Sequence, residues 1–200
     1  MPQDNLHMTS LEVTHSKTAP EIAALVEKMR PGISGIVNHT LTHRPRLLKP
    51  AIGYDASAIA LNFIPAAGEG LTEGRTAKDD AYSYHHFRRD LYSLCEQAGT
   101  RVDSRYVVPS AHLTIGRFIT TKDFAKDDDE SSSDMAKMKR LVDKIEEINA
   151  WLQAEYWPSE DGSPVRAGGE WIIGSEKGLD SRMGKLWYGG GQTVELGKGF

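Results

Sequence analysis

Two segments of the chain share one pattern of side chains that could do chemistry. The sequence reads HMT at residues 7–9 and HLT at residues 112–114, so in both a histidine is followed two positions later by a threonine. In an extended strand, residues i and i+2 point to the same face. Each segment would therefore present an imidazole and a hydroxyl group side by side, and we refer to the two as the first and the second motif.

The polar side chains of these motifs suit the cleavage of a phosphodiester without a metal ion. Histidine titrates near neutral pH, so one imidazole can take a proton from water while the other protonates the departing ribose oxygen. We expect His7 and His112 to form this acid–base pair, and either histidine fits either role. Thr9 and Thr114 would donate hydrogen bonds to the phosphate oxygens, on which charge develops in the transition state.

The position of the motifs strengthens this interpretation, because two matches among seven histidines are weak on their own. Each motif begins an extended segment that an amphipathic helix pattern follows. The first segment covers residues 6–14, and its helix begins after Thr18, where Glu21 completes a capping box, and ends at the Pro-Gly pair 31–32. The other expected elements are strands at 46–49, 57–64, 106–119, 170–174 and 185–188, a loop at 68–78, and helices from 79 or 80 to 98 and at 135–157.

The order of these elements predicts the fold class. A strand, a helix, two strands and a helix are followed by a strand, a helix and two strands, which is a near-repeat. We expect an α+β fold in which residues 1–200 form a single domain of two similar halves, with the motifs facing each other across one cleft. Residues 126–134, a run of acidic and small polar side chains, are expected to be a disordered insert rather than a metal site.

Paired His-x-Thr motifs at this separation resemble those of the two-histidine (2H) phosphoesterase superfamily, which includes RNA 2′,3′-cyclic phosphodiesterases and 2′-5′ RNA ligase-like proteins. A closer similarity, to a fungal branch described as RNA ligase/cyclic nucleotide phosphodiesterase-like proteins, extends over nearly the whole chain. It lies in the segments THRPRLLKP, YSYHHFRRDLY, SRYVVPSAHLTIGRF, EEINAWL, GEWIIGSEKGLDSR and LWYGGG. The resemblance implies a bilobal α+β fold, with two pseudo-symmetric lobes of antiparallel sheets flanked by helices around a central groove that both motifs line.

The motifs and the resemblance together predict an enzyme. We expect a metal-independent phosphoesterase that hydrolyses a 2′,3′-cyclic phosphate, on an RNA end or on a small cyclic nucleotide, and that needs no cofactor. Two alternatives use the same site: a non-catalytic module that binds a nucleotide or an RNA end, and a 2′-5′ RNA ligase, which runs the reverse reaction with the same residues. The expected partner is a small nucleotide or an RNA terminus, and the chain is expected to be a monomer.

Four further residues are candidate substrate contacts. Arg88 lies one helical turn after Tyr84, at the edge of an apolar stripe, and could reach a phosphate. Tyr82, Tyr106 and Trp187 could stack on a base.

Other reactive side chains are expected to have structural roles. Strand alternation puts Arg117 on the face opposite His112, where it would form a structural ion pair. The single cysteine, Cys95, lies on the apolar face of its helix and is expected to be a buried thiol rather than a nucleophile. The histidines expected at the surface or in packing are His15, His39 and His43.

The composition argues against several classes of protein. The chain has 24 Lys and Arg against 28 Asp and Glu, a formal net charge of -4, which argues against binding nucleic acid mainly by phosphate neutralisation and favours a small substrate or a short terminus. No apolar run approaches the roughly 20 residues that a membrane span needs, and the sequence begins without the pattern of a signal peptide. Because a lone cysteine cannot form an internal disulfide, the expected compartment is the cytoplasm, with the nucleus as the alternative.

Overall fold

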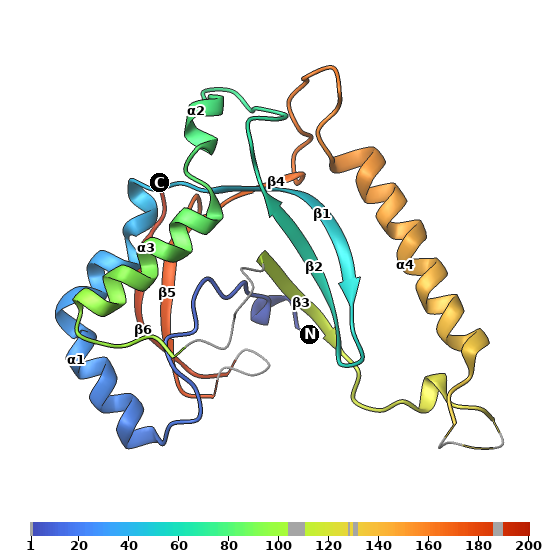
Figure 1. Cartoon of the computed structure of the whole chain (residues 1–200), viewed down its shortest axis with the longest axis horizontal. Helices are drawn as coiled ribbons and strands as arrows, with labels where there is room; N and C mark the ends of the chain where they lie inside the picture. Colours follow the sequence, from blue (N-terminus) through green and yellow to red (C-terminus); the bar gives the residue numbers. More distant parts are fainter. Residues whose placement is uncertain (1, 104–110, 128, 130–131, 186–189) are drawn as a thin grey trace.

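The computed structural model describes residues 2–103, 111–127, 129, 132–185 and 190–200, which fold into helices and two antiparallel sheets (Figure 1). The expected α+β class is therefore confirmed. The helices are α1 (Ala19–Val37), α2 (Ala77–Asp80), α3 (Tyr84–Gln97) and α4 (Met135–Tyr156), with short 3-10 turns η1 (Gln3–Asn5), η2 (His39–Leu41) and η3 (Lys122–Phe124). The strands are β1 (Arg46–Tyr54), β2 (Ala58–Pro65), β3 (Ala111–Arg117), β4 (Glu170–Ile172), β5 (Lys177–Met183) and β6 (Gln192–Lys198).

The larger sheet has four strands in the order β3-β2-β1-β4, and all of its neighbouring pairs are antiparallel. The turn between β1 and β2 is held by Asp55, whose carboxylate accepts hydrogen bonds from the backbone N–H groups of Ser57 and Ala58. At the other edge, Met8 forms an isolated antiparallel bridge with Leu113 of β3. The N-terminal segment therefore contacts the β3 edge of the sheet through this one residue pair.

Helix α4 packs against β1, on the opposite side of the sheet from α1 and α3 in Figure 1. Its N-cap is Asp134, whose carboxylate accepts hydrogen bonds from two backbone N–H groups of the first turn. Its buried residues are Ile145 and Leu152. The helix matches the one predicted at 135–157 to within a residue.

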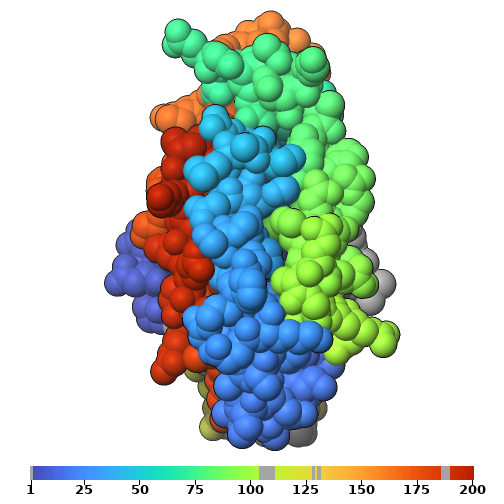
Figure 2. All heavy atoms as spheres, turned by 90° about the vertical axis from the view of Figure 1, so that its left-hand side faces the viewer, coloured from blue at the N-terminus to red at the C-terminus, as the bar shows by residue number. Residues whose placement is uncertain are grey.

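The two-stranded sheet β5-β6 packs against α1, and Figure 2 shows α1 between β6 and α3 on one face of the molecule. This contact depends on glycine. A Cβ atom on Gly197 would lie 2.0 Å from the carbonyl oxygen of Val37, and one on Gly178 would lie 2.6 Å from the same atom. Any side chain at these two positions would force the hairpin away from the helix.

The main core lies between the larger sheet and α3. Tyr84, Phe87 and Leu91 project from one face of α3 and are buried. They pack against the sheet through Leu47, Ala111 and Ile173, with Met8, Phe63 and Trp171 at the margin. Because Met8 packs here, the first motif is attached to the core through its middle residue.

A buried ion-pair network crosses the molecule at Arg46. Its guanidinium lies 2.6 Å from a carboxylate oxygen of Asp80 and 3.1 Å from one of Glu170. Arg75 contacts the second oxygen of Asp80 at 2.9 Å. The network therefore joins β1, α2 and β4.

The expected end of the first helix at residues 31–32 is wrong. Helix α1 continues through Pro31 to Val37 because its apolar stripe continues: Ile33 and Val37 are both buried. Proline removes one helical hydrogen bond, and the burial of these side chains offsets that loss. Gly32 allows α1 to approach α3, since a Cβ atom there would lie 2.9 Å from the Cβ atom of Ala98.

Other expected elements also differ from the structure, and β1 continues to Tyr54, beyond the strand predicted at 46–49. The helix predicted from 79 or 80 to 98 is two helices, because Ser83 begins α3 with a capping box of its own. The strand predicted at 106–119 is β3, and residues 104–110 lie outside the described residues. Of the strand predicted at 185–188, Lys185 is not in a strand and the rest lies outside the described residues, while the hairpin β5-β6 was not predicted.

The described residues of the 126–134 segment are tied to their surroundings. The backbone N–H of Lys126 donates to the carbonyl of Ser132, Ser133 bridges to Ala125, and Asp134 caps α4. The described ends of the segment therefore have hydrogen-bonded neighbours. No helix of the described residues has both the length and the apolar character needed to cross a membrane.

Candidate functional site

The register of the Met8–Leu113 bridge brings the two motifs together. In an antiparallel pair, the neighbours of a bridged pair also face each other. In the register of this isolated bridge, His7 falls opposite Thr114, and Thr9 falls opposite His112. Because Met8 packs against the margin of the main core, alternation places the two histidines and the two threonines on the other face.

This pairing gives the site compact dimensions. Side chains directly opposite each other in an antiparallel pair have Cβ atoms about 4.5–5.5 Å apart, and diagonal neighbours are about 7–8 Å apart. His7 and His112 are diagonal neighbours in the register of the bridge. Their imidazoles can therefore reach opposite sides of a single phosphate group, with one threonine beside each.

Strand β3 contains a β-bulge just after the second motif. Ile59 and Ala60 are consecutive in β2, but they pair with Gly116 and Thr114, so Ile115 is an extra residue in β3. A bulge of this kind displaces the regular alternation of side chains between the two faces of a sheet.

The bulge turns Arg117 to the face of the motifs. Arg117 pairs with Ala58, which is two residues from Ala60, the partner of Thr114. Ala58 and Ala60 point to the same face, so Arg117 shares a face with Thr114 and His112. The expectation that Arg117 lies opposite His112 is therefore wrong, because strict alternation cannot anticipate a bulge.

Burial and nearby positive charges hold the pKa of His112 below its ordinary value. Burial has the larger effect, followed by the charges of Arg117, His7 and Arg88. Both influences disfavour the protonated imidazole. His112 is therefore a neutral imidazole, able to accept a proton, at neutral pH.

His7 is exposed and has a defined tautomer. Its Nδ1 lies 2.9 Å from the backbone carbonyl oxygen of Asn5. A carbonyl oxygen only accepts, so Nδ1 carries a hydrogen, and Nε2 remains as the ring nitrogen that can exchange a proton with a substrate. The backbone of the first motif is also contacted from α3, where the hydroxyl of Tyr84 lies 3.5 Å from the carbonyl oxygen of Thr9.

Arg88 has an unsatisfied donor. Its Nη1 is buried and has no hydrogen-bond partner within the described part of the chain. Its charge acts on His112, so it lies near the second motif. A buried guanidinium nitrogen without a partner is costly unless an anion completes it, which supports the sequence-based choice of Arg88 as a phosphate contact.

Of the three candidates for stacking on a base, Tyr82 contacts other side chains and two lie outside the described residues, and the single cysteine is buried. The hydroxyl of Tyr82 donates to Asp90 at 2.7 Å and lies 3.2 Å from His39. Tyr106 and Trp187 lie outside the described residues. Cys95 is buried, and burial raises its pKa to about 11, as expected for a structural thiol.

A cavity of about 460 Å³ lies elsewhere, beside β4, where Val165, Gly168 and Glu170 contribute to its lining. None of the four polar motif residues lines it.

Comparison of the chain with known protein families, curated proteins and solved structures gives no match. The case for a function therefore depends on the residues themselves.

Proposed function

We propose that the protein is a metal-independent phosphoesterase that hydrolyses a 2′,3′-cyclic phosphate on an RNA end or a small cyclic nucleotide. The observation that carries the proposal is the antiparallel Met8–Leu113 bridge, whose register gathers His7, Thr9, His112 and Thr114 on one face of the sheet. The proposal includes the finer fold expected from the 2H superfamily, two pseudo-symmetric lobes around a groove that holds these residues.

The two histidines have different roles in this reaction. His112 is the base, because its lowered pKa keeps it neutral: it removes a proton from the attacking water as the water oxygen bonds to phosphorus. The bond from phosphorus to one ribose oxygen breaks, and His7 donates a proton from Nε2 to that oxygen. The product is a ribose phosphomonoester, and solvent returns the histidines to their starting states.

The remaining polar groups stabilise the phosphate. Thr9 and Thr114 donate hydrogen bonds to its non-bridging oxygens, whose charge grows as the fifth bond to phosphorus forms. Arg88 and Arg117 supply positive charge beside His112. Guanidinium groups suit phosphate because their N–H groups match two oxygens at once.

The test is turnover of a 2′,3′-cyclic mononucleotide. We expect His7→Gln and His112→Gln to lower the rate by about 10²–10⁴-fold, because glutamine keeps bulk but cannot transfer a proton. His85→Gln, at an exposed position on α3, is the control and should keep full activity. Affinity for the nucleotide without turnover in the wild type would indicate a binding module instead.

A chelator separates this mechanism from metal-assisted hydrolysis. With imidazoles as both acid and base, EDTA should leave the rate unchanged. Loss of activity in EDTA that added metal restores would contradict the proposal.

A further inference from the structure

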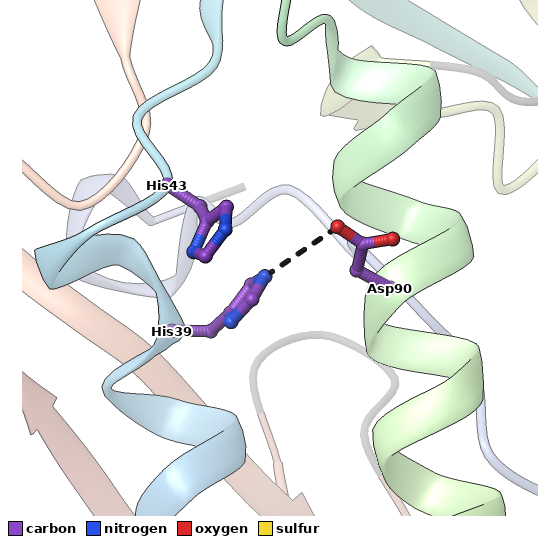
Figure 3. Close-up of side chains that lie close together, drawn as sticks. All are labelled: His39, His43 and Asp90. Atoms are coloured by element: carbon purple, nitrogen blue, oxygen red, sulfur yellow. Dashed lines mark ion pairs between the residues drawn. The ribbon is translucent and has the colours of Figure 1, made fainter.

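A second cluster of polar side chains lies between η2 and α3. His39 and His43 come from the turn that follows α1, and Asp90 comes from α3. Figure 3 shows the two imidazoles and the carboxylate pointing toward one another. One ligand atom from each of the three lies within 4.8 Å of the other two, and Nε2 of His39 lies 3.9 Å from a carboxylate oxygen of Asp90.

The local fold holds these residues in place. The backbone N–H of His43 donates to the carbonyl of His39 at 3.1 Å, which closes one turn and stacks the two rings with centroids 4.1 Å apart. The ring of His39 also stacks on buried Phe87, and all three side chains of the cluster are half-buried. The cluster is therefore a fixed part of the fold.

Neighbouring groups orient the ligand atoms. The hydroxyl of Tyr82 donates to Asp90 at 2.7 Å. Nδ1 of His43 is engaged with the hydroxyl of Thr42 at 2.9 Å, which leaves Nε2 of His43 for another partner. Outer hydrogen bonds of this kind, to a carboxylate and to the second nitrogen of an imidazole, are typical of metal centres.

We propose that His39, His43 and Asp90 bind a divalent transition metal ion of the zinc class. Two imidazole nitrogens and one carboxylate oxygen form a ligand set that Zn²⁺ uses when a further position is left to water or another molecule. Neighbouring ligands of tetrahedral zinc are about 3.3 Å apart at bond lengths of about 2.0–2.1 Å. The ligand atoms of the cluster lie within 4.8 Å of one another, so binding of the ion draws the three side chains closer together.

This site is distinct from the proposed phosphoesterase centre. Arg88 and Asp90 are two residues apart on α3, which is about 200° around a helix. Their side chains therefore point in nearly opposite directions. Arg88 lies close enough to His112 to lower its pKa, and Asp90 points toward His39 of η2. The spacing of His39 and His43 is visible in the sequence, but Asp90 joins them only through the packing of α3 against the end of α1.

The test titrates metal-free protein with Zn²⁺ by calorimetry, and with Co²⁺ by visible absorption. We expect one Zn²⁺ per chain with a dissociation constant below about 10 μM. Bound Co²⁺ should show the visible absorption bands of an ion with fewer than six ligands. His43→Ala and Asp90→Asn should each weaken binding by at least tenfold, and Tyr82→Phe by about 10-fold or more through the orientation of Asp90. His85→Ala, at an exposed position on the same helix, should bind as the wild type does.

Two results would overturn the proposal: no Zn²⁺ binding of that strength by the wild type, or equal binding by His43→Ala and the wild type. Circular dichroism verifies that each variant is folded, and two ligand variants at separate elements guard against misfolding of one of them. Phosphoesterase turnover is measured on the same samples. Because EDTA should remove the metal without changing the rate, the metal site and the proposed phosphoesterase activity can be tested separately.

Discussion

His112 lies among positive charges, and this determines the pH dependence of the proposed reaction. Its pKa is lowered by burial first and then by Arg117, His7 and Arg88. A base with a lowered pKa stays competent down to lower pH. The rate should therefore rise with pH around a midpoint below the ordinary histidine value of about 6.5.

Arg117→Gln tests this account of His112. Removing a positive charge lets the pKa of His112 rise, so the acidic limb of the pH–rate profile should move to higher pH. The shift should be modest and should shrink in high salt, because Arg117 is exposed and its charge is screened. Arg101→Gln, a charge that does not act on His112, should leave the limb in place. An unmoved limb in Arg117→Gln would mean that the bulge does not aim this side chain at the site.

Arg88→Met should separate function from stability. We expect kcat/KM to fall by about 10–100-fold, because a charge-assisted hydrogen bond to phosphate is worth about 1.5–3 kcal/mol. The free energy of unfolding should stay the same or increase, since the substitution removes a buried donor that lacks a partner. Steady-state kinetics and urea denaturation measure the two effects, with Arg89→Met as the control on the same helix. A variant that is both destabilised and fully active would show that Arg88 has a structural role.

At the residue scale, the sequence predicts which residues belong to the candidate site better than it predicts the face of the sheet to which their side chains point. His-x-Thr spacing was sufficient to select four residues that the register then gathers, and an apolar-stripe argument selected Arg88. Arg117 was assigned to the wrong face, because the bulge depends on which residue of β2 each residue of β3 meets. That information is not present in either strand alone.

Among the elements, α4 packs against β1 and also forms hydrogen bonds to its backbone, and Asn149 makes two of them. Strand β4 pairs with Arg46, Leu47 and Leu48 of β1, so it does not reach Ile52. Asn149 of α4 takes its place there: its oxygen accepts from the backbone N–H of Ile52 at 2.6 Å, and its nitrogen donates to the carbonyl of Ile52 at 2.9 Å. A side chain thus completes part of a strand edge that would otherwise be open.

Asn149→Leu should therefore destabilise the protein by about 1–3 kcal/mol, because it leaves two partly buried backbone groups without partners. Gln153→Leu, one turn later at an exposed position, adds a similar apolar side chain and should change the free energy of unfolding by less than about 0.5 kcal/mol. Urea denaturation of both variants is the measurement. Equal stability of Asn149→Leu and the wild type would show that solvent replaces the amide.

Local signals at the ends of elements predict helices well and strand partners poorly. Gly99 ends α3 with a φ of 83°, and the start of α4 at Asp134 follows from capping chemistry. Pro31 wrongly predicts the end of α1, because a proline is a local signal in the sequence. The burial of Ile33 and Val37, which continues the helix, depends on the rest of the molecule. The hairpin β5-β6 escaped prediction because KGLDSRM and QTVELGK contain few apolar residues in alternation.

Across the whole molecule, the Arg46 network links elements that are far apart in the sequence. The pKa of Asp80 is lowered: burial acts to raise it, and the hydrogen bonds from Arg46 and Arg75 outweigh burial. A carboxyl group with a lowered pKa binds protons more weakly in the folded state than in the unfolded state. Its contribution to stability is complete above the ordinary aspartate pKa of about 4 and is lost as the pH falls below it.

Asp80→Asn should reduce the free energy of unfolding at neutral pH by about 3–5 kcal/mol, because it leaves the buried Arg46 charge short of its partner. The variant should also lose less stability than the wild type between about pH 4 and pH 2. Asp143→Asn, which breaks an exposed pair with Lys139, should cost less than about 1 kcal/mol. Urea denaturation across this pH range measures both effects, and a stability difference that does not depend on pH would contradict this role for Asp80.

The bridge between Met8 and Leu113 also protects the site against misassembly. A slip of one residue between two strands moves every side chain to the opposite face. Here such a slip of the first segment would turn Met8 out to solvent and turn His7 and Thr9 toward the main core, whose described members are mostly apolar side chains. Met8 takes no part in the proposed reaction. Its packing against the core nevertheless favours the one register in which the polar residues of the two motifs share a face.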